Sequence, residues 1–221
     1  MSPHPRQVVI LLPASVHLLD AAGPAQVFVA ANDVGGTYRV SFFAERGQVV
    51  AHQGLGLVAD EQLPDLGPRD LMLVAGQRSD FGRITGRPAP APAQFSASIR
   101  TALITHHAAG GEVGSICSGA RTLGLAGLLD GRNCTTHHEL VGQLQQEFPL
   151  ARVLMDRLFV TDDRVHTSAG VASGVDLALD LVAGDHGPRV AAAVAHTLVL
   201  PLRSGAHSSQ LSVFLTFRDH L

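Results

Sequence analysis

The sequence predicts an α/β fold in which helices cover both faces of a mostly parallel sheet. Short β-branched or leucine-rich runs alternate with longer segments of helical period, as such a sheet requires. The 221 residues suit one large domain better than two. With 46% hydrophobic and 16% charged residues, the composition is globular rather than disordered or fibrous.

The predicted strands are short β-branched or leucine-rich runs. The five clearest strands span residues 7–12, 38–44, 71–75, 112–116 and 164–167. Four further segments have helical period, at residues 23–35, 93–110, 173–187 and 188–200. In the first of these, Val27, Phe28 and Ala31 lie on one stripe, and glycines follow as a stop signal.

Two segments depart from this alternation. Residues 44–60 alternate around glycines and predict a small hairpin. Residues 82–94 form a Pro/Ala run, which we expect to be a surface loop or the lead-in to the next helix. From residue 201 the sequence becomes polar and rich in turn residues, so we predict a domain over 1–200 and a C-terminal extension over 201–221.

The charge, the cysteine content and the N-terminal sequence indicate which kinds of partner and which compartment to expect. The formal net charge of -3 gives no basic footprint for a DNA backbone, so these residues alone are not expected to hold DNA. Two cysteines are too few for a disulfide framework, which suits a reducing cytoplasm. The apolar run before Pro13 is too short for a signal peptide or a membrane span, so we expect no membrane partner.

Cys117 is the first candidate for a reactive or ligand-contacting residue. It directly follows a predicted strand, and we expect a helix to begin there, in an elbow where converging backbone N–H groups and the helix dipole favour a thiolate. Small neighbours suit such a crowded turn: Gly114, Ser115, Ser118, Gly119 and Ala120. The alternative is a cysteine that only packs in the core, which is the role we expect for Cys134.

Two further residues are candidate partners of Cys117. Asp20 is expected at the end of the first strand, before a helix opened by Gly23 and Pro24, and at the same sheet edge as the cysteine. There its carboxyl group would share a proton with a thiolate, and like-charge repulsion would raise its pKa. The alternative is an ordinary acid at a helix N-terminus.

His137 is the preferred imidazole partner, from the segment CTTHHEL. The alternative is that His137 and His138 are ordinary polar residues at a helix start capped by Thr136. No third ligand with a recognisable spacing follows, so we predict no metal site.

Backbone groups complete the predicted pocket. The amides of Gly76 and Gln77, after the third strand, could form an anion or oxyanion pocket, and Ser168, Ala169 and Gly170 could line the same space. An ordinary turn or close packing explains these small residues equally well.

The order of these features resembles the DJ-1/PfpI superfamily, which is related to class I glutamine amidotransferase domains. The resemblance covers nearly the whole chain. The segments LLDAAGPAQVF, GLLDGRNCTTHHEL, TSAGVASGVDLALDLV and HTLVLPLRSGAHSSQLSVF are most similar to the N-terminal domain of AraC-type transcriptional regulators.

The resemblance implies a flavodoxin-like three-layer α/β/α sandwich, commonly dimeric, that binds a small-molecule effector without a cofactor. DNA would be contacted only through a helix-turn-helix domain that is not among these 221 residues. The implied catalytic or effector-contacting residues are Cys117, Asp20 and His137. The implied ligand-binding residues are Gly76, Gln77, Ser118, Gly119, His138, Ser168, Ala169 and Gly170.

Two other functions stay open. A stand-alone cysteine enzyme is one, because isonitrile hydratases share the D-x-x-G-P and T-T-H segments; they usually have Thr where Ser118 stands. A degenerate scaffold that only dimerises is the other. Gln77 stands in the place of a glycine found in relatives, which weakens the anion pocket, and His138 replaces an aromatic residue, which favours a polar ligand.

Overall fold

The structure is a computed structural model that describes residues 4–77 and 95–200. In these ranges the central sheet has six strands in the order β2-β1-β5-β6-β10-β9, and only the β10–β9 pair is antiparallel. The strands are β1 (Arg6–Leu11), β2 (Tyr38–Phe43), β5 (Leu71–Val74), β6 (Glu112–Ile116), β9 (Phe159–Asp162) and β10 (Val165–Ser168).

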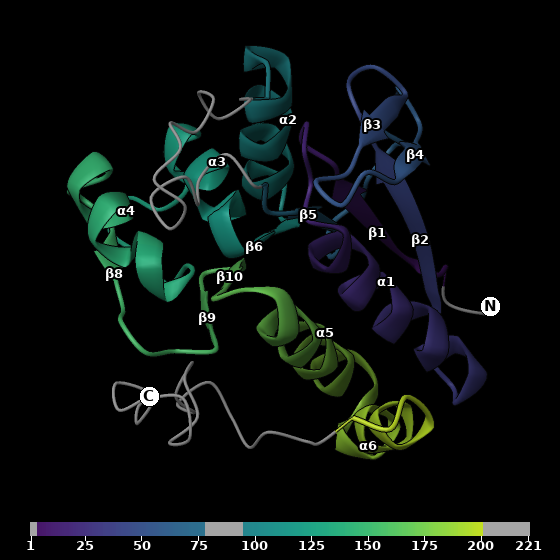
Figure 1. Cartoon of the computed structure of the whole chain (residues 1–221). Coiled ribbons are helices and arrows are strands. Elements are labelled where there is room, and N and C mark those ends of the chain that lie inside the picture. Colours follow the sequence, from purple (N-terminus) through teal and green to yellow (C-terminus); the bar gives the residue numbers. More distant parts are fainter. Residues whose placement is uncertain (1–3, 78–94, 201–221) are drawn as a thin grey trace, which may run out of the picture.

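Helices cover both faces of this sheet (Figure 1). On one face lie α1 (Leu18–Asp33), α5 (Val171–His186) and α6 (Pro188–Thr197), which pack against one another. On the other face lie α2 (Ala97–Ala108) and α3 (Ala120–Leu125), and α4 (Val141–Glu147) adds Leu144 to their apolar cluster. The chain is therefore a flavodoxin-like α/β sandwich, as predicted.

Strand β1 shows why these layers form. Its side chains alternate between the two faces: Val8 and Ile10 belong to the apolar cluster under α1 and α5, and Val9 and Leu11 to the cluster under α2 and α3. All four are fully buried. A strand covered on both faces has to be apolar at every position, which accounts for its continuous hydrophobic run.

The five predicted strands are confirmed to within one residue at each end. The hairpin predicted over residues 44–60 is also confirmed, as the antiparallel pair β3 (Gln48–Val50) and β4 (Gly56–Val58). The edge strand β9 was not predicted, nor was the small parallel pair β7 (Asn133–Cys134) and β8 (Arg152–Val153). The Pro/Ala run and the segment from residue 201 lie outside the described residues.

The predicted start of the first helix is wrong. Helix α1 begins at Leu18 and includes Gly23 and Pro24, so Asp20 lies in its first turn rather than at the end of the first strand. Tertiary packing holds these two residues within the helix. A Cβ on Gly23 would lie 3.0 Å from Cγ2 of Val175, and one on Gly174 would lie 3.4 Å from Cγ of Pro24. Close contact between α1 and α5 therefore outweighs the local preference of proline for a helix start.

A buried ionic network closes the amino-terminal edge of the sheet. Arg6 pairs with Glu112 at 2.8 Å and with Asp185, and His166 Nε2 lies 2.7 Å from the Glu112 carboxylate. The Tyr38 hydroxyl donates a hydrogen bond to Asp185 Oδ2, with 2.6 Å between the two oxygens. Burial alone would raise the pKa of Glu112, but the contacts with His166 and Arg6 hold it below its usual range. The network joins four strands to α5.

Within the described ranges, no helix has both the length and the apolar character needed to cross a membrane.

Candidate functional site

Cys117 occupies the turn between β6 and α3. Its φ of 56° lies in the left-handed region, which costs a non-glycine residue roughly 1 kcal/mol. A one-turn 3-10 helix, Cys117–Gly119, leads from it into α3. Thr136 Oγ1 donates to the Cys117 carbonyl at 2.8 Å and helps to hold the turn. The predicted helix start at the cysteine is therefore confirmed, and the side chain of Cys117 is fully buried.

Asp20 contacts Cys117 across Gly76. A Cβ on Gly76 would collide with the Asp20 carboxylate and would lie 2.9 Å from Cβ of Cys117, so only glycine fits between them. Burial raises the pKa of Asp20 to about 7, although hydrogen bonds from the Gly76 amide and the Cys117 thiol oppose that rise. The predicted direction of the pKa shift is confirmed, but its main cause is burial rather than like-charge repulsion.

His137 lies on the other side of the cysteine. A Cβ on Gly170 would lie 3.2 Å from Cδ2 of His137 and 3.9 Å from Sγ of Cys117, which places both side chains around this glycine. Burial lowers the pKa of His137 to about 4, with smaller contributions from His138 and His17. The imidazole is therefore neutral near pH 7.

The start of the turn at residues 138–140 is stabilised differently from the predicted capping. The backbone amide of Glu139 donates to His137 Nδ1 at 3.4 Å, while the Thr136 hydroxyl is bonded to the Cys117 carbonyl. Thr136 is therefore not the cap that the alternative interpretation required. His138 is exposed, and its ring lies 4.3 Å from that of His137.

Backbone amides of the predicted pocket already have acceptors within the protein. The Gln77 amide donates to Ser118 Oγ at 2.9 Å. On the β10–α5 connection, the Ala169 amide donates to Leu158 and the Gly170 amide to Ser173 Oγ. A ligand would have to displace these acceptors, so ligand binding by Gly76, Gln77, Ser118, Gly119, Ser168, Ala169 and Gly170 stays a prediction.

The thiol is enclosed rather than open to solvent. Cys117 and Asp20 are both 0% exposed, and Ser168 beside them in the fold is also fully buried. The structure brings the cysteine, the carboxyl group and the imidazole together, and the described residues around them cover the thiol and the carboxyl group completely. Within the described ranges, no group of three or more His, Cys, Asp or Glu residues is arranged to hold a metal ion.

Sequence reasoning missed a second pair of histidines near this site. The rings of His17 and His52 lie 5.6 Å apart, and Gln53 Nε2 lies 3.3 Å from His17 Nδ1. His17 immediately precedes α1 and contributes to the low pKa of His137. Its position three residues before Asp20 was a usable signal, because the loop after β1 meets the same sheet edge as Cys117.

Comparisons with known proteins agree with the fold. The DJ-1/PfpI family profile matches residues 6–184. The HTH-type transcriptional regulator CdhR of Pseudomonas aeruginosa is 34% identical over 157 residues, which is 71% of this chain and 43% of that protein. The regulator GbdR of the same species is 28% identical over 200 residues, 89% of this chain and 51% of that protein. The chain thus spans about half the length of these regulators.

A solved structure and an enzyme are also similar to this chain. The crystal structure of an AraC family transcriptional regulator from Pseudomonas putida has a TM-score of 0.75 at 24% identity, and the match covers 88% of this chain and 100% of that one. The isonitrile hydratase of Pseudomonas putida is 40% identical over only 72 residues, 31% of this chain and 29% of the enzyme.

Replacing Asp20 by Asn is expected to remove a pH dependence of stability. The folded pKa of Asp20, about 7, lies above its unfolded value of 3.8. Between these values the folded state holds a proton that the unfolded chain has lost, so stability falls as the pH rises from about 4 to 7. The free energy of unfolding of the wild type, relative to Asp20→Asn, should fall over this range by on the order of 4 kcal/mol.

Chemical denaturation at several pH values measures this difference, and Asp33→Asn, an exposed carboxyl on the same helix, is the matched control. A pH-independent difference for Asp20→Asn would contradict a buried carboxyl with a raised pKa.

Cys117 is expected to react with iodoacetamide faster than Cys134. Both thiols are fully buried, so exposure does not separate them. Burial and the charge of Asp162 raise the pKa of Cys134 to about 12, whereas Cys117 lies at the amino end of a helical turn, which favours the reactive thiolate. Mass spectrometry of Cys117→Ser and Cys134→Ser, each with one thiol, compares the rates near pH 7. Equal rates would contradict the expectation.

Proposed function

Because the chain belongs to the DJ-1/PfpI family, we propose that it is the effector-binding domain of an AraC-type DNA-binding transcriptional regulator. The observation that carries this proposal is the pattern of coverage. Two regulators match along 71% and 89% of this chain, but the matches account for only 43% and 51% of their own lengths. The remaining half is where the proposal assigns a helix-turn-helix domain.

The net charge of the chain supports the assignment of DNA binding to a separate domain. The whole chain carries a formal net charge of -3, which gives no general attraction for a phosphate backbone. DNA contact is therefore assigned to the attached domain, and effector contact to this one. In the proposal, residues 1–200 form the effector domain, residues 201–221 begin the linker, and the domain acts in the cytoplasm as a homodimer.

Effector contact is assigned to the carboxyl edge of the sheet. Cys117, Asp20 and His137 gather there, with His138 exposed beside His137. Asp20 can hold or release a proton near neutral pH, and neutral His137, whose Nδ1 accepts from the Glu139 amide, can donate a hydrogen bond from Nε2. Because the thiol is enclosed, effector binding has to be coupled to an opening of this edge, and such coupling suits a sensor better than a rigid scaffold.

The sequence of the gene beyond the codon for Leu221 tests the proposal directly. We expect an open reading frame of about 100 further residues with two helix-turn-helix patterns, the second helix of each being the DNA reader. A stop codon immediately after Leu221 would overturn the regulator assignment.

The second candidate is a cysteine-dependent hydratase, which the partial match to isonitrile hydratase favours. In that mechanism the Cys117 thiolate attacks the electrophilic carbon of the isonitrile, and Asp20 donates the proton that this carbon gains. The Asp20 carboxylate left by this step then takes a proton from water, and the hydroxide adds to the same carbon. The hydroxyl proton passes to the nitrogen as the C–S bond breaks, which releases the formamide and the thiolate and leaves Asp20 protonated again.

Turnover of a simple isonitrile separates the two candidates. As an effector domain, the wild-type protein is expected to form no formamide above the background rate, as measured by chromatography. Formamide production that Cys117→Ser abolishes and Cys134→Ser leaves intact would establish the hydratase instead.

A further inference from the structure

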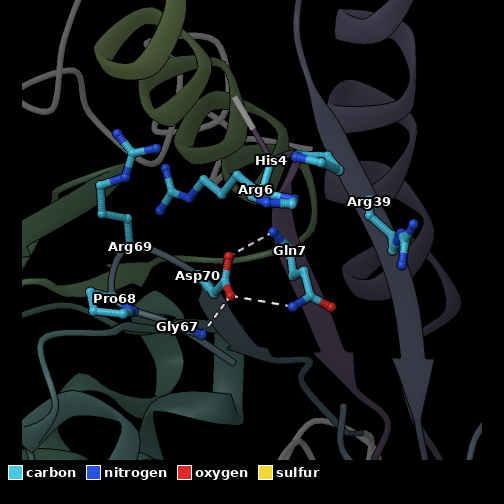
Figure 2. A pocket seen from close by; sticks show the side chains of 9 residues that line it. His4, Arg6, Gln7, Arg39, Gly67, Pro68, Arg69 and Asp70 are labelled. Carbon is cyan, nitrogen blue, oxygen red and sulfur yellow. Dashed lines mark hydrogen bonds between the residues drawn. The ribbon is translucent and has the colours of Figure 1, made fainter. Parts of the chain in front are cut away.

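A polar cavity lies at the opposite edge of the sheet from Cys117. It encloses about 410 Å³ where β1 and β2 begin and where the turn before β5 ends. Arg6, Gln7, Arg39, Arg69 and Asp70 are among the residues that line it (Figure 2). Because the strands are parallel, their amino ends gather here and their carboxyl ends gather at Cys117. This site, which we call the basic cavity, is therefore separate from the site described above.

Positive charge prevails in the basic cavity. Its lining holds three arginines and one carboxylate, that of Asp70. This carboxylate is already used within the protein: Oδ1 accepts from the Gln7 amide at 2.8 Å, and Oδ2 accepts from the Gly67 amide at 2.8 Å (Figure 2). It holds a turn in place rather than neutralising an arginine.

Two of the three arginines carry uncompensated charge. Arg39, in β2, and Arg69, in the turn before β5, are exposed, and neither has an ion pair or side-chain hydrogen bond in the described parts of the chain. In Figure 2 the side chain of Arg69 extends to the same side as that of Arg6, while Arg39 lies on the other side of Gln7. The cavity therefore has guanidinium groups on both sides.

Arg6 supplies a buried donor to the same cavity. Its side chain is 6% exposed and pairs with Glu112 and Asp185. Its Nε–H, however, is buried without a hydrogen-bond partner among the described residues. A buried N–H without an acceptor is unfavourable, so an acceptor atom at this position would be stabilised. This is the observation, independent of the exposed arginines, that points to a ligand.

The backbone of Arg69 adds a further indication. Its φ is 74°, in the region where glycine is much less strained than any L residue. The turn around it is closed by the Asp70 amide, which donates to the Gly67 carbonyl at 3.2 Å. An arginine at a position that glycine suits better points to a use for its side chain, because strained backbone is concentrated at binding sites.

We propose that the basic cavity binds a small, multiply charged oxyanion through Arg39, Arg69 and the Nε–H of Arg6. Guanidinium groups pair with two oxygens of a phosphate or a carboxylate at once, and their charge does not change near neutral pH. The volume is that of a site for a small molecule rather than for a macromolecule. The ligand class therefore includes phosphate monoesters and dicarboxylates, and both present the same oxyanion chemistry.

Binding of inorganic phosphate and of succinate to the whole chain tests this proposal. Calorimetry and thermal unfolding are followed at one fixed ionic strength, with chloride as the reference anion, because general salt effects also act on surface arginines. We expect at least one of the two anions to bind and to raise the melting temperature above its value in chloride. Phosphate alone would identify a phosphate ligand, and succinate alone a dicarboxylate.

Variants separate binding from folding. Arg69→Gly removes the guanidinium and relieves the strained backbone, so it should melt at or above the wild-type temperature in chloride yet bind the anion at least tenfold more weakly. Arg39→Gln should also weaken binding. The matched control is Arg152→Gln, an exposed arginine that does not line the cavity and should bind as the wild type does. The proposal is overturned if neither anion stabilises the protein beyond chloride, or if Arg69→Gly binds as tightly as Arg152→Gln.

Discussion

The left-handed backbone of Cys117 is the constraint on which the carboxyl edge of the sheet depends. Because the chain turns so sharply after β6, the turn packs directly against the end of β5, where a Cβ on Gly119 would collide with the Val74 carbonyl. The same crowding excludes a side chain at Gly76, between Asp20 and Cys117, and limits the space at Gly170, between Cys117 and His137. Glycines from three separate connections therefore serve one purpose, which is to let the carboxyl group and the imidazole approach the thiol.

Each edge of the sheet contains a buried carboxyl group, and the surroundings shift the pKa of the two groups in opposite directions. At the carboxyl edge, burial without a cationic partner keeps Asp20 protonated up to about pH 7. At the amino edge, Glu112 is also buried, but Arg6 and His166 hold its pKa below the usual range. The first arrangement costs stability and leaves a proton available near neutral pH, which suits a functional site. The second joins β1, β6, β10 and α5 and keeps the Glu112 carboxylate ionised and paired, which suits a structural role.

The features that could be predicted from the sequence are those that depend on residues close together in the chain. Short β-branched or leucine-rich runs predicted the bounds of five strands to within a residue, and small residues around Cys117 indicated the turn. The start of α1 was missed because contacts of Gly23 and Pro24 with α5, 150 residues later in the chain, decide it. The hydrogen bond from the Gln77 amide to Ser118 Oγ could not be predicted either, since it depends on how the strand ends meet. The basic cavity carries no motif, because its arginines come from three separate segments.

An enclosed thiol bears on how this domain would act as a sensor. A ligand shifts an equilibrium only to the extent that it binds one state better than the other. In the described conformation the amides of Gln77, Ala169 and Gly170 already have internal acceptors, so an effector gains little from them without a rearrangement. In the proposed function, the closed edge is therefore the unliganded state, and the effector is selected by the contacts it makes once Cys117, Asp20 and His137 become accessible. Helices α1 and α3, which begin beside this edge, are the elements whose positions such an opening would change.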